Sequence, residues 1–252
     1  MAPRRAIERE FGVPFPGEIQ PPEHWTQTAL KRLPAEEPAD WNAIFGRAAP
    51  LVLDLGCGNG RYLIGSALWR PDRNHLGIDV LPVVIRYATR RANQRALANI
   101  RFGVCDADSF LTRFVAPGSV QEIHLYHPQP YHDEAEADQR LVTPRFLARV
   151  HRALAPEGEL YLQTDHPGYG QYMLETAREF FEFQQRADKW PDAPKGRTRR
   201  EIIALRRGLE IFRGVGRPRP GLDEAALEEL CARLPPPRFA LDRRVAELDR
   251  WE

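Results

Sequence analysis

The feature that most constrains the fold of this chain is an alternation of short apolar segments with amphipathic ones across residues 51–164. The apolar runs have the length of strands, and the segments between them repeat apolar residues at helical spacing. Alternating strands and helices form right-handed crossovers, which give a parallel sheet with helices on both faces. The pattern predicts an α/β fold with a Rossmann-like, mostly parallel, doubly wound sheet. The predicted strands are Leu51–Leu55, His75–Val80, Ile100–Cys105, Glu122–Tyr126 and Glu159–Thr164, and the predicted helices are Arg61–Trp69, 82–93 and Thr143–Leu154.

A glycine-rich turn follows the first predicted strand without a gap. Gly56, Gly58 and Gly60 alternate with Cys and Asn, and a predicted helix begins directly after them. Glycine is needed where the chain turns sharply and a ligand touches the backbone, because a Cβ would obstruct both. Arg61 stands where the dinucleotide fingerprint has its last glycine, so the spacing argues against NAD. The turn predicts a ligand site at the carboxyl end of the strand.

Carboxylates stand at or near the ends of three successive strands. Asp79 ends the second strand about 20 residues after the glycines, where it can accept the hydroxyls of a ribose. Asp106, followed by Ala107, ends the third strand and can accept the exocyclic amine of an adenine. Asp54 can hold the glycine turn or the amino group of a ligand, or serve as a buried structural carboxylate. Together they predict an adenosine-containing ligand, and the alternative is an ordinary turn with Asp79 and Asp106 as helix caps.

Proline marks the limits of the regular pattern. The 23 prolines among 252 residues gather in residues 14–38 and 191–237, on either side of the alternating region. A chain of this length buries the core of one medium α/β domain with appendages. We therefore expect an N-terminal arm at 1–50, a Rossmann-like domain at 51–216 and a C-terminal helical extension at 217–252.

Charge and cysteine content exclude several classes of protein. The net charge of +1 gives no bulk electrostatic reason to expect nucleic acid, so such a partner must be argued from local patches. Cys57, Cys105 and Cys231 are far apart and form no Cys-x-x-Cys pair, which argues against a disulfide scaffold or a zinc site and favours a reducing cytoplasm. No apolar run approaches membrane-spanning length, and the N-terminus is unlike a signal peptide, so we expect no membrane partner.

Ordered motifs in the second half of the chain resemble the bacterial tRNA (guanine-N7)-methyltransferase family. The family's Phe-Pro-Asp-Pro-Trp is matched by His127–Tyr131, which reads His-Pro-Gln-Pro-Tyr. Arg140–Leu147 is similar to its Arg-Leu-Val-x-Pro-x-Phe-Leu, and Gln163–Asp165 with Tyr169 is similar to its Ala-Thr-Asp-Trp-x-x-Tyr. Thr198–Glu201 matches its Thr-x-x-Glu segment. The likeness spans roughly residues 51–216.

The resemblance implies a class I methyltransferase that uses S-adenosylmethionine and methylates N7 of a guanosine in the tRNA variable loop. Carried over by position, it implies cofactor contacts from Asp54, Asp79 and Asp106, beside those expected from the glycine turn and from Ala107. It implies contacts to the target guanosine from Asp165, Thr198 and Glu201. The catalytic positions implied are Gln129 and Asp165.

Two departures from the family concern the acceptor half of the site. The aspartate of the family's Pro-Asp-Pro is replaced by Gln129, which keeps a carbonyl acceptor but cannot offset positive charge. The family's basic loop is replaced by His132–Arg140, which carries four carboxylates that would repel an RNA backbone. Residues 186–219 hold eleven Lys and Arg against four Asp and Glu, and Arg86, Arg90, Arg91 and Arg95 form a basic stripe on one helix. Each is a candidate RNA surface or a solvated face.

Other interpretations remain open from sequence alone. Asp165 can be the N-cap of a helix at 167–182, and Glu201 can be a surface charge. His124, His127 and His132 lack carboxylate or cysteine partners at ligand spacing, so we expect no metal. The alternatives to a tRNA enzyme are a methyltransferase of the same fold acting on another RNA or a small molecule, and a non-catalytic cofactor-binding paralogue.

Overall fold

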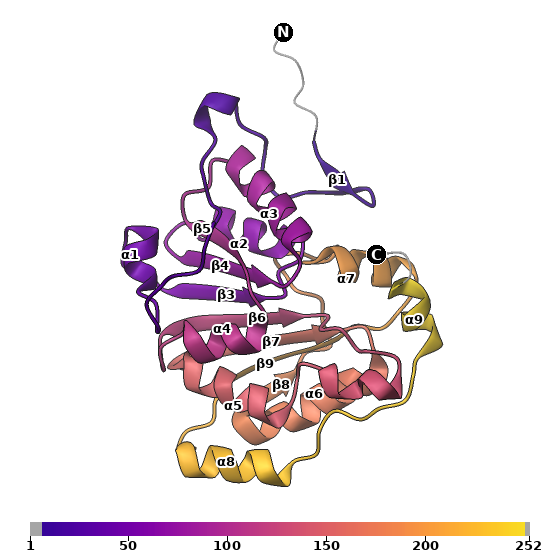
Figure 1. The fold of residues 1–252 in the computed structure, drawn as a ribbon. Helices are drawn as coiled ribbons and strands as arrows, with labels where there is room; N and C mark the ends of the chain where they lie inside the picture. Colours follow the sequence, from indigo (N-terminus) through magenta and orange to yellow (C-terminus); the bar gives the residue numbers. More distant parts are fainter. Residues whose placement is uncertain (1–6, 250–252) are drawn as a thin grey trace.

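A computed structural model describes residues 7–249 of the chain, whose main element is one sheet with strand order β5-β4-β3-β6-β7-β9-β8 (Figure 1). The first five strands in this order are parallel, and β9 and β8 are each antiparallel to the preceding strand. The strands of the sheet are β3 (Leu51–Leu55), β4 (Asn74–Asp79), β5 (Ile100–Val104), β6 (Val120–Tyr126), β7 (Leu154–Thr164), β8 (Phe181–Gln185) and β9 (Phe212–Pro218). The predicted mostly parallel sheet is confirmed.

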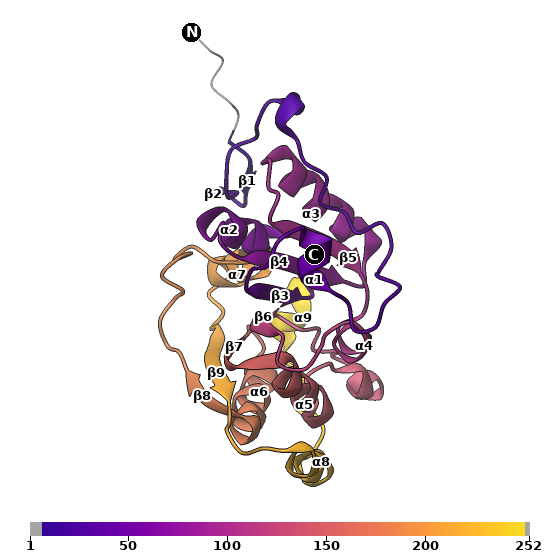
Figure 2. The same ribbon diagram turned by 90° about the vertical axis from the view of Figure 1, so that its left-hand side faces the viewer.

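Helices cover both faces of the sheet, as the alternation predicts (Figures 1 and 2). One face carries α2 (Arg61–Trp69) and α3 (Pro82–Gln94). The other face carries α4 (Ala107–Arg113), α5 (Pro144–Ala153) and α6 (Pro167–Phe180), and α8 (Glu224–Arg233) packs outside α5. No helix of the described residues is long and apolar enough to cross a membrane.

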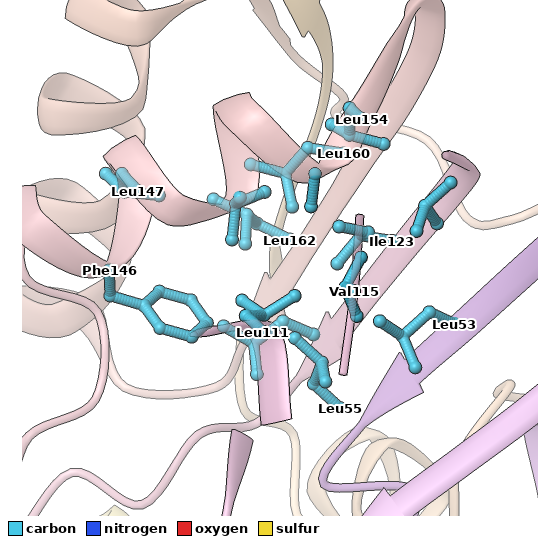
Figure 3. Packing of buried hydrophobic residues seen from close by; sticks show 14 of the residues in the cluster. Leu53, Leu55, Leu111, Val115, Ile123, Phe146, Leu147, Leu154, Leu160 and Leu162 are labelled. Carbon is cyan, nitrogen blue, oxygen red and sulfur yellow. The ribbon is translucent and has the colours of Figure 1, made fainter. Parts of the chain in front are cut away.

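The apolar core follows from strands that are buried on both faces. Along β3, Leu53 and Leu55 point to one face and Val52 to the other, and all three are fully buried. Leu53 and Leu55 pack with Ile123 of β6 and, through the layer between sheet and helices, with Phe146 of α5 (Figure 3). Burying a large apolar side chain stabilises a fold by about 1.5–3 kcal/mol. The first strand is therefore fixed at the centre of the sheet, and its carboxyl end is a rigid place for a ligand loop.

Capping residues and prolines fix the starts of several helices at the positions predicted from the sequence. The hydroxyl of Thr143 accepts a hydrogen bond from Phe146 N and caps α5, as predicted. Pro82 occupies the first turn of α3, where a missing N–H does no harm. The elements missing from the sequence prediction include the β8–β9 pair and a short hairpin of β1 (Arg9–Glu10) and β2 (Val13–Pro14).

The N-terminal region lies against the sheet domain through η1 (Pro22–His24), α1 (Trp41–Phe45) and the hairpin. Trp41 of α1 stacks near Phe110 of α4, with ring centroids 5.5 Å apart. Glu8 forms ion pairs with Arg91 and Arg95, so the predicted basic stripe on α3 is wrong for these two residues. Residues 1–6 and 250–252, the outer ends of the predicted arm and extension, lie outside the described residues.

Two elements lie at the carboxyl edge of the parallel strands. Figure 1 shows α7 (Arg199–Arg206) and α9 (Arg243–Asp249) there, beyond the ends of β3, β6 and β7. The two helices share a small apolar cluster that includes Ile203 of α7 and Val245 of α9. The C-terminal extension thus returns from α8 to the edge of the sheet where ligands bind in α/β folds.

Candidate active site

A cleft opens at the point where the strand order of the sheet reverses. The chain leaves β3 for β4 and β5 on one side and returns to β6 on the other, and ligands of open α/β sheets bind at such a switch point. The walls of the cleft include Gly56–Asn59, which follow β3, and His127–Pro130, which follow β6. Its volume of about 400 Å³ lies within the range of small-molecule sites.

The three glycines of the turn have two different uses. All have positive φ: +73° at Gly56, +52° at Gly58 and +76° at Gly60. A Cβ at Gly56 or Gly58 would meet no atom within 4 Å, and both residues line the cleft, so their missing side chains leave the cleft open. A Cβ at Gly60 would lie 2.9 Å from the Cβ of Ala88, so this glycine lets α2 and α3 approach each other.

Asp54 is the buried carboxylate of the cleft. Its side chain is 2% exposed and lines the cleft, and no hydrogen bond to it occurs within the described part of the chain. Burial raises its pKa, the carboxylate of Asp79 raises it further and Arg197 lowers it, so that the pKa of Asp54 is about 8. A buried, unpaired carboxylate on the wall of an open cleft is suited to a cationic ligand group.

The other predicted cofactor residues hold backbone rather than line the cleft. Asp79 accepts hydrogen bonds from Gly58 N at 3.0 Å and from Leu81 N at 2.9 Å, and so fixes the glycine turn to the start of α3. Asp106 accepts a hydrogen bond from Ser109 N and caps α4, in which Ala107 is the first residue. In this structure Asp106 therefore acts as a helix cap, which was the alternative to an adenine contact. Ribose and adenine contacts at these positions stay predictions.

Asp165 lies across the cleft, at the end of β7. His127 Nδ1 is 3.0 Å from one carboxylate oxygen and Arg200 Nε is 2.8 Å from the other. Burial raises the pKa of Asp165, but the hydrogen bonds and charges of His127 and Arg200 lower it more, and the net pKa is well below its ordinary value. Asp165 is not the N-cap of α6, because His166 accepts the hydrogen bond from Tyr169 N.

A hydrogen-bonded relay orients His127, a residue that sequence analysis considered only for metal binding. Trp190 Nε1 donates to Gln163 Oε1 at 2.5 Å, and Gln163 Nε2 is 2.8 Å from His127 Nε2. Because that amide donates, the ring proton of His127 must lie on Nδ1, from which it is donated to Asp165. The only sequence signal was a histidine directly after a buried strand. No group of three or more possible metal ligands occurs among the described residues.

Thr198 and Glu201 have different positions relative to the cleft. Thr198 lines it and caps α7 by accepting a hydrogen bond from Glu201 N at 3.0 Å. Glu201 is 1% exposed, accepts from Arg213 at 2.5 Å and from Arg197 N at 2.7 Å, and does not line the cleft. The interpretation of Glu201 as a surface charge is therefore wrong, and its contact with an acceptor base stays a prediction. Gln129 lines the cleft.

The C-terminal extension contacts the acidic loop beside the acceptor wall. Arg238 donates to Glu134 at 2.9 Å and to Asp138 at 2.8 Å, so one cation pairs with two of the loop's four carboxylates. Arg140 is buried and its guanidinium stacks on Phe239 at 3.8 Å. The carboxylate of Asp249 in α9 is hydrogen-bonded to His132, the first residue of the loop, and lines the cleft, so the extension supplies a wall that the sequence did not predict.

Comparison with known proteins agrees with this geometry. A family model described as putative methyltransferase matches residues 48–213. The tRNA (guanine-N(7)-)-methyltransferase of Alkalilimnicola ehrlichii is 32% identical over 191 residues, which cover 75% of this chain and 81% of the relative. The chain belongs to the tRNA (guanine-N7)-methyltransferase family. The enzyme of the same name from Paraburkholderia xenovorans is 33% identical over 181 residues, or 72% of this chain and 69% of that one.

Solved structures confirm the fold of this family member independently of sequence. The crystal structure of the 16S rRNA methyltransferase KamB matches 77% of this chain and 99% of its own with a TM-score of 0.58, at 16% identity. At that identity the likeness shows the fold alone. The confirmed class I methyltransferase architecture places the switch-point cleft at the edge of the sheet where such a fold holds its ligand.

Proposed function

We propose that this protein transfers the methyl group of S-adenosylmethionine to N7 of a guanosine in the variable loop of tRNA. The observation that carries the proposal is the composition of the cleft. One wall combines the open glycine turn with the unpaired carboxylate of Asp54, and the opposite wall presents Gln129 and an ionised Asp165. The names of the relatives support tRNA and guanine N7 as acceptor and atom.

The donor wall fits S-adenosylmethionine by shape and by charge. The space that a Cβ would take at Gly56 and Gly58 is open, so a ligand can approach the backbone there. Asp54 faces the cleft without a partner, and a cationic group placed beside it would lower its pKa from about 8 and ionise it. When bound, the cofactor supplies an electrophilic methyl group on a cationic sulfur.

The acceptor wall fits a nucleophile that needs no base. Guanine N7 has a free lone pair and no proton to lose, so its methylation needs position and electrostatics rather than proton transfer. The ring gains positive charge as the bond forms, and Asp165 is held ionised by Arg200 and oriented by His127. The amide oxygen of Gln129 can accept a hydrogen bond from an exocyclic amine. These residues hold and stabilise the base, and no residue has to move a proton.

The proposal is tested by chemical scission of tRNA. Unmodified tRNA is incubated with the protein and S-adenosylmethionine and then treated with borohydride and aniline, which cleave at 7-methylguanosine. We expect one new cleavage in the variable loop. The isosteric Asp165→Asn variant keeps the size of the side chain but loses its charge and one of its two acceptor oxygens, and we expect its rate to fall by about 10²–10³-fold. Intact tRNA after treatment with the wild-type protein would refute the proposal.

A methyltransferase with another acceptor is the second candidate, because the acidic loop departs from an RNA-binding surface. The same protein is offered mixed cellular RNA with labelled cofactor, and binding is measured over a range of salt. A steep salt dependence identifies RNA as the partner. Absence of binding even at low salt points to a small acceptor.

A further inference from the structure

The two flanks of the catalytic cleft differ in charge and in accessibility. On one flank the acidic loop, His132–Arg140, is tied down by Arg238 and by the pairing of His132 with Asp249. An RNA backbone approaching there would meet exposed carboxylates rather than free cations. The acidic loop therefore offers an RNA backbone no cationic surface on this flank.

The other flank has a second cleft, of about 370 Å³, between α7 and the N-terminal hairpin. We call it the basic groove. Its charged lining residues are Lys189, Lys195 and Arg206, all exposed, and its lining includes no carboxylate. Gly12 and Val13 of the hairpin and two apolar residues of α7 form the rest of its walls with Pro194. The groove thus presents three cations to solvent along one channel.

These cations differ from four of their neighbours in the basic run at 186–219, which form ion pairs. Arg197 is paired with Asp192, Arg200 with Asp165, Arg213 with Glu201, and Arg217 with Glu157 and Glu159. Lys189, Lys195 and Arg206 of the groove form no ion pair within residues 7–249. Four cations of the run are therefore used in ion pairs within the protein, and three of those without an ion pair meet in the groove.

The basic groove and the catalytic cleft border the same helix, α7. Thr198 and Arg199, at the start of this helix, line the cleft, whereas Arg206 at its end lines the groove. The guanidinium of Arg199 lies 5.3 Å from the ring of Phe11, the hairpin residue next to Gly12. Phe11 is 41% exposed, so an aromatic ring and a cation stand at the junction of the two clefts. Exposed aromatic rings beside cations bind unstacked bases in single-stranded RNA.

We propose that the basic groove binds the phosphate backbone of the tRNA next to the acceptor guanosine, and that Phe11 stacks on a neighbouring base. The inference rests on the proposed function, because it takes tRNA as the substrate. It explains how a family member with an acidic loop holds RNA: the docking surface lies along α7 and the N-terminal hairpin. The groove is assigned to RNA because its three cations have no ion pair and no carboxylate beside them in the lining, and because an exposed aromatic ring that can stack on a base stands next to them.

The test measures tRNA binding and tRNA methylation separately in two charge-matched variants. The groove variant carries Lys189→Glu, Lys195→Glu and Arg206→Glu. The control variant carries Lys31→Glu, Arg32→Glu and Arg178→Glu, which change the net charge equally at exposed sites outside both clefts. All six side chains are exposed, and equal melting temperatures verify that both variants fold.

We expect the groove variant to bind tRNA at least 100-fold more weakly, with the slope of log affinity against log salt reduced by about 2–3. Its KM for tRNA should rise while its affinity for S-adenosylmethionine stays unchanged. The control variant should lose less than threefold in its affinity for tRNA. Phe11→Ala should weaken binding by about tenfold with an unchanged salt slope, because stacking is not a phosphate contact.

Each contrary result has a separate meaning. Equal losses in the groove and control variants would attribute the effect to bulk charge and overturn the groove. Unchanged tRNA binding in the groove variant, with normal scission by the wild-type protein, overturns the groove and leaves the methyltransferase proposal intact. Groove-dependent binding without any scission refutes the tRNA N7 reaction while the groove stands. A wild-type protein that binds an acidic peptide in the groove and no tRNA overturns the assignment to RNA.

Discussion

Replacing Asp54 with Asn separates the ligand role of this carboxylate from its effect on stability. Asp has a pKa of about 3.9 in an unfolded chain, whereas the pKa of buried Asp54 is about 8. The folded protein therefore holds a proton that the unfolded chain releases. This contribution to stability is complete below about pH 3.9 and is lost as the pH rises towards 8. The asparagine variant keeps the shape and has no proton to lose.

The size of the effect follows from the two pKa values. One pKa unit corresponds to about 1.4 kcal/mol, so between pH 5.5 and pH 7.5 the wild-type protein should lose about 2.5 kcal/mol relative to Asp54→Asn. Urea denaturation of both proteins at the two pH values, without cofactor, measures this difference. All other titrating groups are shared by the two proteins, so they cancel in the comparison.

The same variant should bind S-adenosylmethionine more weakly although it is more stable at neutral pH. A hydrogen bond to a charged group contributes about 1.5–3 kcal/mol, which corresponds to about 10–150-fold in affinity by calorimetry. Opposite signs for stability and affinity are expected of a residue that is maintained for a ligand. A stability difference that is the same at pH 5.5 and pH 7.5 would refute the reasoning, because it would mean that Asp54 is not protonated in the cleft.

Two further predictions concern residues that hold the site in place. Gly60→Ala should lower stability by about 3 kcal/mol, because its Cβ would lie 2.9 Å from that of Ala88 at positive φ. The matched Gly56→Ala should lower stability only by the backbone cost of about 1–2 kcal/mol, because no atom lies within 4 Å of a Cβ at this position. Thermal melts that show equal losses of stability in the two variants would contradict this reasoning. Glu201→Gln should destabilise the protein by about 3–5 kcal/mol in urea, because it leaves the buried charge of Arg213 without its partner. A loss under 1 kcal/mol, with methyl transfer abolished, would instead make Glu201 a residue of the acceptor site.

The parallel half of the fold could be predicted because its signals are local and repeated. The strand Leu51–Leu55 and the helix Arg61–Trp69 have the ends that the sequence predicts, since a glycine turn separates an apolar run from a helical one. The β8–β9 pair was missed because Phe181–Gln185 directly follows α6 without a turn signal. Its pairing with Phe212–Pro218 depends on contacts between distant segments.

Part of the donor wall of the cleft was predicted from the sequence, and the acceptor wall was predicted incompletely. Gly56 and Asp54 stand beside a recognisable strand end, so sequence order alone brings them to the cleft. His127 and Asp249 reach the cleft from segments whose approach is decided by tertiary packing, His127 through the relay from Gln163 and Asp249 through α9. Sequence spacing carries no information on such contacts. The charge run at 186–219 likewise became interpretable only when its internal ion pairs were seen.

The central claim is that the switch-point cleft brings a methyl donor to N7 of a guanine held beside Asp165. Two transcripts of the same tRNA test it, one made with guanosine and one with 7-deazaguanosine, which replaces N7 by carbon and keeps the pairing edge of the base. The account predicts transfer of labelled methyl from S-adenosylmethionine to the first transcript and none to the second, with similar binding of both. Equal methylation of the two transcripts would contradict it, because the acceptor would then be another atom.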